Sequence, residues 1–177
     1  GNQGVPVSVN VSRTDIYAID VVKTFKELVA EYKLPVNLIE IEITESSYAS
    51  DYEIISKVVD DFRLAGFTVL MDDFGSGYSS LNTLKDIPVD ILKLDMKFME
   101  KSKNTKRSAD IVQMVVAMAD KLGMPVIAEG VETKEQADFL GRIGCDIIQG
   151  YYYAKPMSME EFEQLLNKYP YRDIVQK

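Results

Sequence analysis

The sequence predicts an α/β fold with a parallel sheet, and three observations support this prediction. Short apolar runs rich in Val, Ile and Leu recur at residues 5–12, 39–44, 68–72, 90–96, 125–130 and 146–151. Amphipathic stretches with helical periodicity lie between them. The runs have little of the one-sided polarity of a sheet that faces water, which is typical of parallel strands covered by helices. Strand followed by helix, six times over, describes a βα array.

The helices are expected at residues 20–32, 51–65, 107–122, 133–143 and 158–169. Thr133 and Ser158 open the last two and are suited to N-cap roles. Gly66, Gly123 and Gly144 follow three of the stretches, as C-cap glycines do. The Val, Ile and Met residues of the third stretch are expected in the core because of their helical spacing.

The βα array fits either an open doubly wound sheet or a barrel. An eight-stranded βα barrel normally needs about 250 residues, so 177 residues would supply six of its eight units. A barrel without two strands has open edges. The barrel interpretation therefore expects the missing quarter to precede Gly1 or to be replaced by another element.

Composition restricts the class of function. A hydrophobic content of 46% fits one globular domain or a large piece of one. The net charge of −8 disfavours binding to nucleic-acid polymers, whereas a small anion bridged by cations remains compatible. The single cysteine, Cys145, excludes an internal disulfide and favours the reducing cytoplasm. No apolar run reaches the roughly 18 residues of a membrane span, so this segment is expected in the cytoplasm, with an anchor elsewhere in a parent protein left open.

Polar side chains interrupt each apolar run towards its C-terminal end. They are Asn10, Glu42, Asp72 with Asp73, Lys93 with Asp95, Glu129 and Gln149. A single buried acid can be a structural residue whose hydrogen bonds are satisfied within the core, although burying it without partners costs free energy. Functional sites of parallel α/β folds, however, assemble at the C-terminal ends of the strands. We therefore expect these groups to converge on one site.

The types of residue in this group indicate metal chemistry. The chain has no histidine, and carboxylate oxygens favour Mg²⁺, Mn²⁺ or Ca²⁺ over structural zinc. Adjacent Asp72 and Asp73 suit a two-metal site in which one carboxylate bridges both ions, an arrangement common in the hydrolysis of phosphate esters. Lys93 is expected to hold the attacking water or to stabilise developing charge.

A glycine-rich segment follows the acid pair and consists of Phe74, Gly75, Ser76, Gly77 and Tyr78. A Gly-x-Gly turn permits unusual backbone angles and close approach to phosphate or metal. A tight strand-to-helix turn explains the glycines equally well. Its attachment to the acid pair makes this segment a candidate mobile loop over the site.

Several motifs resemble those of EAL-domain cyclic-di-GMP phosphodiesterases. Residues 72–81 read DDFGSGYSSL and resemble the family's DDFGTGYSSL signature. Residues 42–45 (EITE) resemble E-x-T-E, residues 93–95 (KLD) resemble K-I-D, and residues 128–133 match AEGVET. Residues 149–151 (QGY), with the following Lys155 and Pro156, resemble the closing motif, and residues 9–12 (VNVS) resemble the strand that supplies an asparagine ligand. The motifs occur in family order and span nearly the whole chain.

The resemblance implies a TIM-like (β/α)₈ barrel that hydrolyses cyclic di-GMP to linear pGpG in bacterial second-messenger signalling. It implies two divalent cations, Mg²⁺ or Mn²⁺, with Ca²⁺ as an inhibitor. The implied metal ligands are Asn10, Glu42, Asp72, Asp73 and Glu129. By the same resemblance, Lys93, Glu129 and Asp73 are the catalytic residues.

The resemblance also implies supporting roles around these residues. Gln149 would lie close to the hydrolytic water that Lys93 positions, and Glu45 would anchor the glycine-rich loop. Asp95 and Glu132 would lie behind the ligands or near the substrate. One ring of residues 151–153 (YYY) would suit stacking on guanine, but packing is the favoured interpretation because aromatic rings are usually buried.

Two departures from the family pattern qualify the interpretation. Ser76 replaces a threonine and keeps its hydroxyl. The Glu-Ala-Leu tripeptide, with a metal-binding Glu and a nearby substrate-contacting Arg, does not occur in the sequence, so residues 1–177 are interpreted as an EAL domain that is incomplete at its N-terminus. The alternative function is a non-catalytic cyclic-di-GMP receptor or a regulatory module. A homodimer and an upstream GGDEF or sensor domain are the expected partners, with no membrane contact by this segment.

Overall fold

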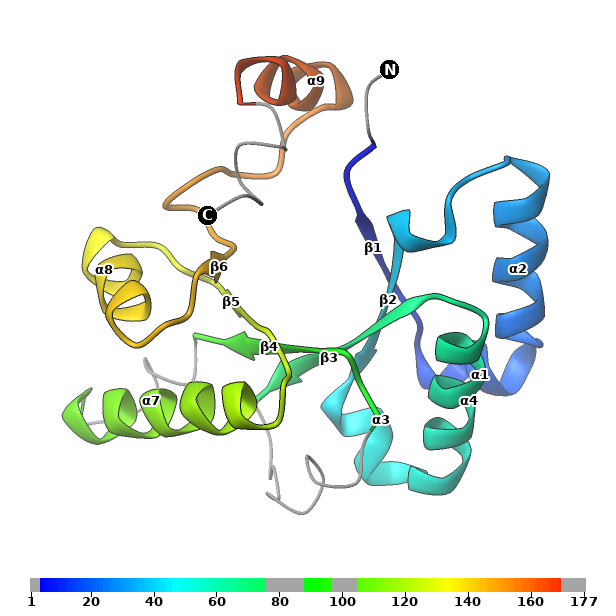
Figure 1. Cartoon of the computed structure of the whole chain (residues 1–177), viewed down its shortest axis with the longest axis horizontal. Coiled ribbons are helices and arrows are strands. Elements are labelled where there is room, and N and C mark those ends of the chain that lie inside the picture. Colours follow the sequence, from blue (N-terminus) through cyan, green and yellow to red (C-terminus); the bar gives the residue numbers. More distant parts are fainter. Residues whose placement is uncertain (1–3, 76–87, 97–104, 170–177) are drawn as a thin grey trace.

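The fold is a curved, six-stranded parallel sheet with helices around its outer side (Figure 1). The computed structural model describes residues 4–75, 88–96 and 105–169. The strand order follows the chain from β1 to β6, and every neighbouring pair is parallel. A doubly wound sheet would reverse its strand order at a switch point. The observed order therefore selects the barrel over the open sheet, with six consecutive parallel strands in the described residues.

The strands agree with the predicted positions within a few residues. Their bounds are Val7–Asn10 (β1), Ile39–Thr44 (β2), Thr68–Phe74 (β3), Ile91–Asp95 (β4), Val126–Glu129 (β5) and Ile147–Ile148 (β6). Strand β6 is shorter than the predicted run of residues 146–151. It ends early because the backbone after Ile148 turns to bond with Val131 instead of continuing in the sheet.

The five predicted helices also form. They are α2 (Val21–Glu31), α4 (Tyr52–Leu64), α7 (Thr105–Lys121), α8 (Lys134–Arg142) and α9 (Met159–Lys168). Two short helices, α1 (Arg13–Ala18) and α3 (Glu45–Ser50), and a 3₁₀ turn, η1 (Val36–Leu38), were not expected. Each is too short to carry a helical pattern of apolar residues.

The predicted helix boundaries are confirmed by their capping geometry. The hydroxyl of Thr133 accepts a hydrogen bond from the backbone N–H three residues later, and that of Ser158 does the same, each within a capping box. Gly66, Gly123 and Gly144 have φ values of 92°, 72° and 84°. This left-handed conformation is the one that C-cap glycines supply.

The core lies between the inner strands and the outer helices. Ile41, Ile43, Val69 and Leu92 are fully buried. The rings of Phe25 from α2, Phe62 from α4 and the nearby Phe67 meet edge to face, with centroids 5.5–6.1 Å apart. Such pairing adds to the stabilisation from burial.

Helix α7 enters the core with only part of its apolar surface. Val112 and Val116 are buried, as predicted, and Ala119 is buried as well. Ile111 is 37% exposed and Met114 is 71% exposed, so the expectation that this whole apolar set is core was too broad. The buried residues follow one face of the helix, whereas Ile111 and Met114 lie outside it.

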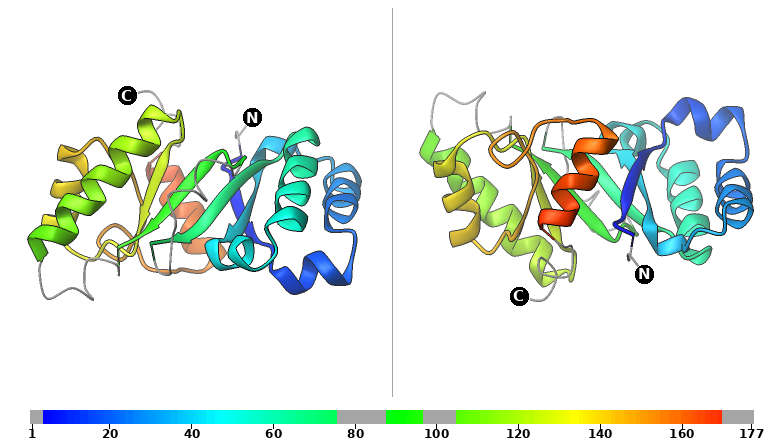
Figure 2. Two further views of the ribbon diagram at one scale, coloured as in Figure 1. Left: turned by 90° about the horizontal axis from the view of Figure 1, so that it is seen from below. Right: turned by 90° about the horizontal axis from the view of Figure 1, so that it is seen from above.

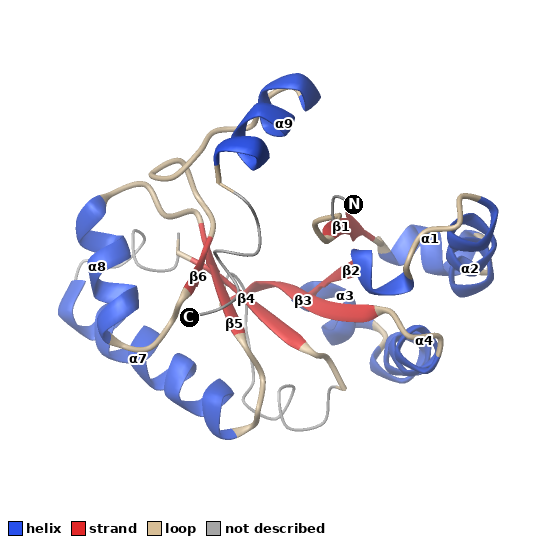
Figure 3. Cartoon of the chain, turned by 45° about the horizontal axis from the view of Figure 1, so that its top comes forward, coloured by secondary structure: helices blue, strands red, loops and turns tan. Residues whose placement is uncertain are grey.

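Strands β1 and β6 are the two ends of the curved row of strands (Figure 3). All four residues of β1 are exposed, and Ile147 of β6 is 50% exposed. Helix α9 stands apart from the helices that cover the outer side (Figure 1) and has no buried residue. Seen from above, it lies in front of the strands (Figure 2). The apolar surface at these ends is thus uncovered in the part of the chain that the structure describes.

The aromatic residues after β6 correct one expectation. Tyr151, Tyr152 and Tyr153 are 57%, 40% and 60% exposed, so the prediction that they pack in the core was wrong. They follow a strand at the end of the sheet, where little described structure covers them. The rings of Tyr152 and Tyr153 contact each other edge to face, and the ammonium of Lys155 lies 5.6 Å from the ring centre of Tyr151.

Among the helices of residues 4–75, 88–96 and 105–169, none is long and apolar enough to cross a membrane.

Candidate active site

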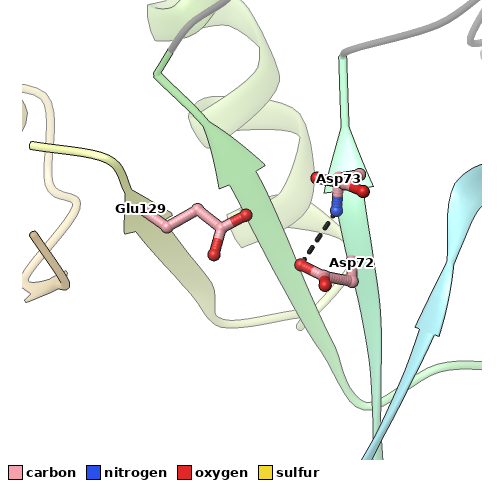
Figure 4. A group of neighbouring side chains, drawn as sticks. All are labelled: Asp72, Asp73 and Glu129. Carbon is pink, nitrogen blue, oxygen red and sulfur yellow. Dashed lines mark hydrogen bonds between the residues drawn. The ribbon is translucent and has the colours of Figure 1, made fainter. Parts of the chain in front are cut away.

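Three carboxylates gather at the C-terminal ends of β3 and β5. One oxygen from each of Asp72, Asp73 and Glu129 lies within 4.8 Å of the others (Figure 4). Asp72 and Asp73 come from the end of β3, and Glu129 is the last residue of β5. The C-terminal edge of the sheet therefore brings acids together from segments more than fifty residues apart in sequence.

A bulge in β3 lets two consecutive acids reach the same cluster. Met71 pairs with Leu92 and Phe74 pairs with Leu94, so three steps along β3 oppose two along β4. Asp73 has a φ of 58°, which aspartate tolerates better than most residues. In a regular strand consecutive side chains point to opposite faces. The extra residue of a bulge re-aims a side chain, and here the backbone N–H of Asp73 donates to Asp72 Oδ1 at 2.9 Å.

Lys93 supplies a cation to this cluster from β4. Its Nζ lies 2.9 Å from Asp72 Oδ1, 3.0 Å from Glu42 Oε1 and 3.1 Å from Glu129 Oε2. Lys93 and Glu42 are 5% and 8% exposed, so this network is shielded from water. One lysine thus contacts acids from three other strands, β2, β3 and β5.

The electrostatics of the cluster leave it with excess negative charge. Burial opposes the charge on Lys93, but the hydrogen bonds that Lys93 donates to Asp72 and Glu42, together with the charge of Glu129, outweigh it, so the pKa of Lys93 is above its ordinary value. Burial raises the pKa of Glu129 above its ordinary value, and the charge of Asp72 adds to this against the opposing effect of Lys93. Carboxylates brought together in this way favour either protonation or a bound cation.

The donor set fits divalent metal ions that prefer oxygen. The three clustered ligands are all carboxylates, which suit Mg²⁺ or Mn²⁺. Asp95 is 6% exposed and faces Glu129 across the β4–β5 pairing. A Cβ on Gly130 would lie 3.7 Å from Asp95 Oδ1, so this carboxylate is directed at the loop after Glu129.

The glycine-rich segment is tied to α3 at its first glycine. Glu45 Oε2 accepts a hydrogen bond from the backbone N–H of Gly75 at 3.3 Å, and Glu45 is only 7% exposed. Phe74 is buried, and Gly75 has a φ of 93°. The remaining residues expected in this loop, Ser76, Gly77 and Tyr78, lie outside the described residues.

The other expected site residues lie around the cluster. Asn10 is exposed on β1 and stands opposite Glu42 in the β1–β2 register. Gln149 is exposed, and its backbone N–H donates to Ala128 O at 2.8 Å. Glu132 is also exposed, and its N–H donates to the side chain of Gln136 at the start of α8. The structure therefore brings together the acids of β2, β3 and β5, while Asn10 lies on the end strand β1 and Gln149 directly follows the end strand β6.

Sequence reasoning missed two features of this site. The bulge at Asp73 was not predicted, although two consecutive acids at the end of an apolar run are a signal for it. The simultaneous contact of Lys93 with three carboxylates was also missed. The sequence signal for this contact is a single lysine at the same position along its strand as the acids on the neighbouring strands.

Comparison with known proteins places these features in context. The family model described as EAL domain matches residues 1–156. The signaling protein YkoW of Bacillus subtilis is 35% identical over 93% of this chain and 20% of its own length. The cyclic di-GMP phosphodiesterase RocR of Pseudomonas aeruginosa is 37% identical over 90% of this chain and 41% of its own length. The chain spans about a fifth of the length of the first curated relatives that it matches.

Solved structures share the fold. The EAL domain of Mycobacterium smegmatis DcpA aligns with a TM-score of 0.83 at 36% identity, over 92% of this chain and 73% of that one. The PaMucR phosphodiesterase in complex with c-di-GMP aligns with a TM-score of 0.82 at 32% identity, over 89% of this chain and 64% of that one. Klebsiella pneumoniae BlrP1 in a manganese and c-di-GMP complex aligns with a TM-score of 0.77 at 30% identity, over 83% and 38%.

Proposed function

This chain belongs to the EAL domain family, and we propose that its site hydrolyses cyclic di-GMP to linear pGpG with the help of divalent metal ions. The observation that carries this proposal is the gathering of Asp72, Asp73 and Glu129 at one strand edge beside the buried Lys93. Relatives named as cyclic di-GMP phosphodiesterases and a neighbour in complex with c-di-GMP support the same substrate.

Two divalent cations, Mg²⁺ or Mn²⁺, are the proposed cofactors, with Ca²⁺ as an inhibitor. Asp72, Asp73 and Glu129 would hold them, with Glu42 and Asn10 completing the set from β2 and β1. When bound, such a pair activates water and neutralises charge on a phosphodiester. Neighbouring structures described with calcium and with manganese support cations of this class.

The protein's own residues would orient the reacting groups. Lys93 keeps its proton at neutral pH, because its pKa is raised. It can therefore donate hydrogen bonds to the attacking water and to a phosphate oxygen. Asp73, which lies at the bulge, would bridge the ions or bind the second one, and Glu129 would hold metal from the side of β5. Gln149, Asp95 and Glu132 would act near the substrate or behind the ligands.

Glu45 is proposed to anchor the glycine-rich segment at its start. It would do so through the hydrogen bond that it accepts from the backbone N–H of Gly75.

Residues 1–177 are further proposed to be the C-terminal part of an EAL barrel that needs two more strands. The separate, exposed ends β1 and β6 support this, and so does the coverage of 73% of the DcpA EAL structure. A cytoplasmic location is proposed for the segment. A homodimer, and an upstream GGDEF or sensor domain, are the proposed partners; one relative is named as a bifunctional diguanylate cyclase and cyclic di-GMP phosphodiesterase.

A second candidate is a receptor that binds cyclic di-GMP without cutting it. A full-length protein without the Glu-Ala-Leu tripeptide would fit this candidate, because a site with fewer acids would hold one metal less tightly; the tripeptide does not occur in residues 1–177.

The two candidates differ in product formation. We would incubate the full-length protein with cyclic di-GMP and Mn²⁺ or Mg²⁺ and quantify linear dinucleotide by chromatography. Product that disappears with a chelator and in Asp72→Asn supports the enzyme; Asp138→Asn, an exposed acid on α8, is the control and should retain activity. Binding without product would establish the receptor instead, and loss of all binding in a folded protein would leave a regulatory module.

A further inference from the structure

The backbone after β6 passes unusually close to the backbone after β5. A Cβ atom on Gly150 would lie 2.1 Å from Val131 O, 2.4 Å from Val131 N and 2.7 Å from Val131 C. Real Cβ atoms essentially never come within 3.0 Å of another atom in this way, and these atoms are main chain and cannot rotate aside. By contrast, a Cβ on Gly141 would meet nothing within 4 Å. Any side chain at position 150 therefore requires the main chain to move.

Three hydrogen bonds hold these two segments together. The N–H of Gln149 donates to Ala128 O at 2.8 Å, the N–H of Val131 donates to Gln149 O at 3.2 Å, and the N–H of Tyr152 donates to Val131 O at 3.0 Å. Val131 itself is fully buried. The absence of a side chain at Gly150 is what lets this ladder close.

The hydrogen bonds of this ladder lie on both sides of Glu129 in the sequence. Ala128, before it, and Val131, after it, bond to the backbone that follows β6, and Glu129 O accepts a hydrogen bond from the N–H of Met96 at 2.9 Å. The backbone of Glu129 is thus fixed by contacts with both neighbouring strands, β4 and β6. Its carboxylate lies with Asp72 and Asp73, so a shift of this backbone would change the spacing of the cluster.

We propose that Gly150 is a positioning residue for the metal cluster, acting through the backbone of Val131 to place the Glu129 carboxylate. The inference rests on the proposed function, because it treats the cluster as a metal site. A side chain at position 150 would push the segments apart and move Glu129 away from the two aspartates. Groups that orient metal ligands typically change metal affinity by about 10–100-fold when they are altered.

The test is a calorimetric titration of Mn²⁺ into the full-length protein and its variants. Gly150→Ala should weaken Mn²⁺ binding by about 10-fold or more with unchanged stoichiometry, since a partly unfolded sample would lose sites instead of affinity. Gly141→Ala, in α8, should bind as the wild type does. Unchanged Mn²⁺ affinity in folded Gly150→Ala would overturn the proposal.

A double-mutant cycle distinguishes action through Glu129 from a general disturbance. In a Glu129→Gln background, Gly150→Ala should cause little further loss of Mn²⁺ affinity, and an equal loss in both backgrounds would also overturn the proposal. If Gly150→Ala does not fold, Tyr152→Pro removes one ladder hydrogen bond without adding an atom at position 150, and the same criteria apply to it. Wild-type protein that binds Mn²⁺ without hydrolysis would refute the enzyme but leave this inference standing.

Discussion

The side chain of Lys93 lies among three carboxylates inside the protein. Its ammonium lies within 3.1 Å of carboxylates from Glu42, Asp72 and Glu129, and its side chain is almost fully buried. Lys134 also pairs with an acid, Asp138, at 2.6 Å, but that pair is exposed on α8. The two lysines therefore offer a matched comparison between a buried ion network and a surface pair.

Lys93→Met should lower both activity and stability. Loss of the only described cation in the cluster leaves one buried carboxylate, Glu42, and two half-buried ones, Asp72 and Glu129, uncompensated, and breaking a buried ion pair from one side costs about 3–5 kcal/mol. Hydrolysis should fall by about 100-fold or more, the scale of a lost hydrogen-bond donor to developing negative charge. Urea unfolding in chelator and a dinucleotide-release assay measure the two effects. Lys134→Met should change neither appreciably, and normal hydrolysis by Lys93→Met would remove this residue from the mechanism.

The pKa of Lys93 sets the pH range of this stabilisation. Because the folded-state pKa is raised, the contribution is fully present below the ordinary lysine value of about 10.4 and is lost only as the pH rises through the higher folded value. The difference in free energy of unfolding between wild type and Lys93→Met should therefore be constant between pH 7 and pH 9, as measured in urea. A difference that shrinks across this range would show that Lys93 releases its proton early.

At the scale of single elements, β3 combines a regular strand with a local irregularity. The strand pairs in register with β2 from Thr68 to Asp72, but the bulge against β4 places Asp73 in the left-handed region. At position 73 the backbone requires a residue that tolerates a positive φ, and metal binding requires a carboxylate. Substitutions can therefore test these two requirements separately.

Asp73→Asn and Asp73→Val both remove the carboxylate, but only the second conflicts with the backbone. Asparagine tolerates positive φ, whereas a β-branched side chain at a φ of 58° costs about 1–2 kcal/mol. Both variants should bind Mn²⁺ more weakly, and only Asp73→Val should be clearly less stable in urea. Equal stability of the two variants would mean that the bulge does not persist in solution.

The same elements show what the sequence could predict. The alternation of Ile39, Ile41 and Ile43 with polar residues predicted β2 and the direction of Glu42, because a strand has a period of two. The convergence of the acids followed from the shared C-terminal edge of parallel strands. Helix α3 could not be predicted, since it begins at Glu45, immediately after a strand, and has no apolar period. The exposure of Tyr151 also escaped prediction, because composition does not say which strand ends a sheet.

For the whole molecule, the ends of the sheet are the main liability. An exposed strand edge with apolar side chains is a template for association with other chains. Val7 is 55% exposed and Val9 is 36% exposed on β1, and Phe162 is 36% exposed on α9. The exposure of these apolar side chains is explained if further strands of the barrel cover them.

Extension of the chain by the βα units proposed to close the barrel should raise its melting temperature and reduce self-association. The reason is that the added strands would pair with β1 and β6 and bury their apolar side chains. Thermal unfolding and light scattering of the 177-residue chain and of the extended chain measure this. An extension of the same composition in scrambled order is the control, and equal behaviour of both extensions would argue against barrel closure.

The position of the acids within the row of strands has a consequence for engineering. Glu42, Asp72, Lys93 and Glu129 come from four successive strands, β2 to β5, inside the two end strands of the row. A circular permutant with new termini between β1 and the strand before it would leave this arc continuous. A chain cut between β3 and β4 would instead give two fragments, one with Glu42, Asp72 and Asp73 and the other with Lys93 and Glu129, and neither would hold the full ligand set until they reassociate. In a domain split at that point, metal binding would report the reassociation of the two fragments.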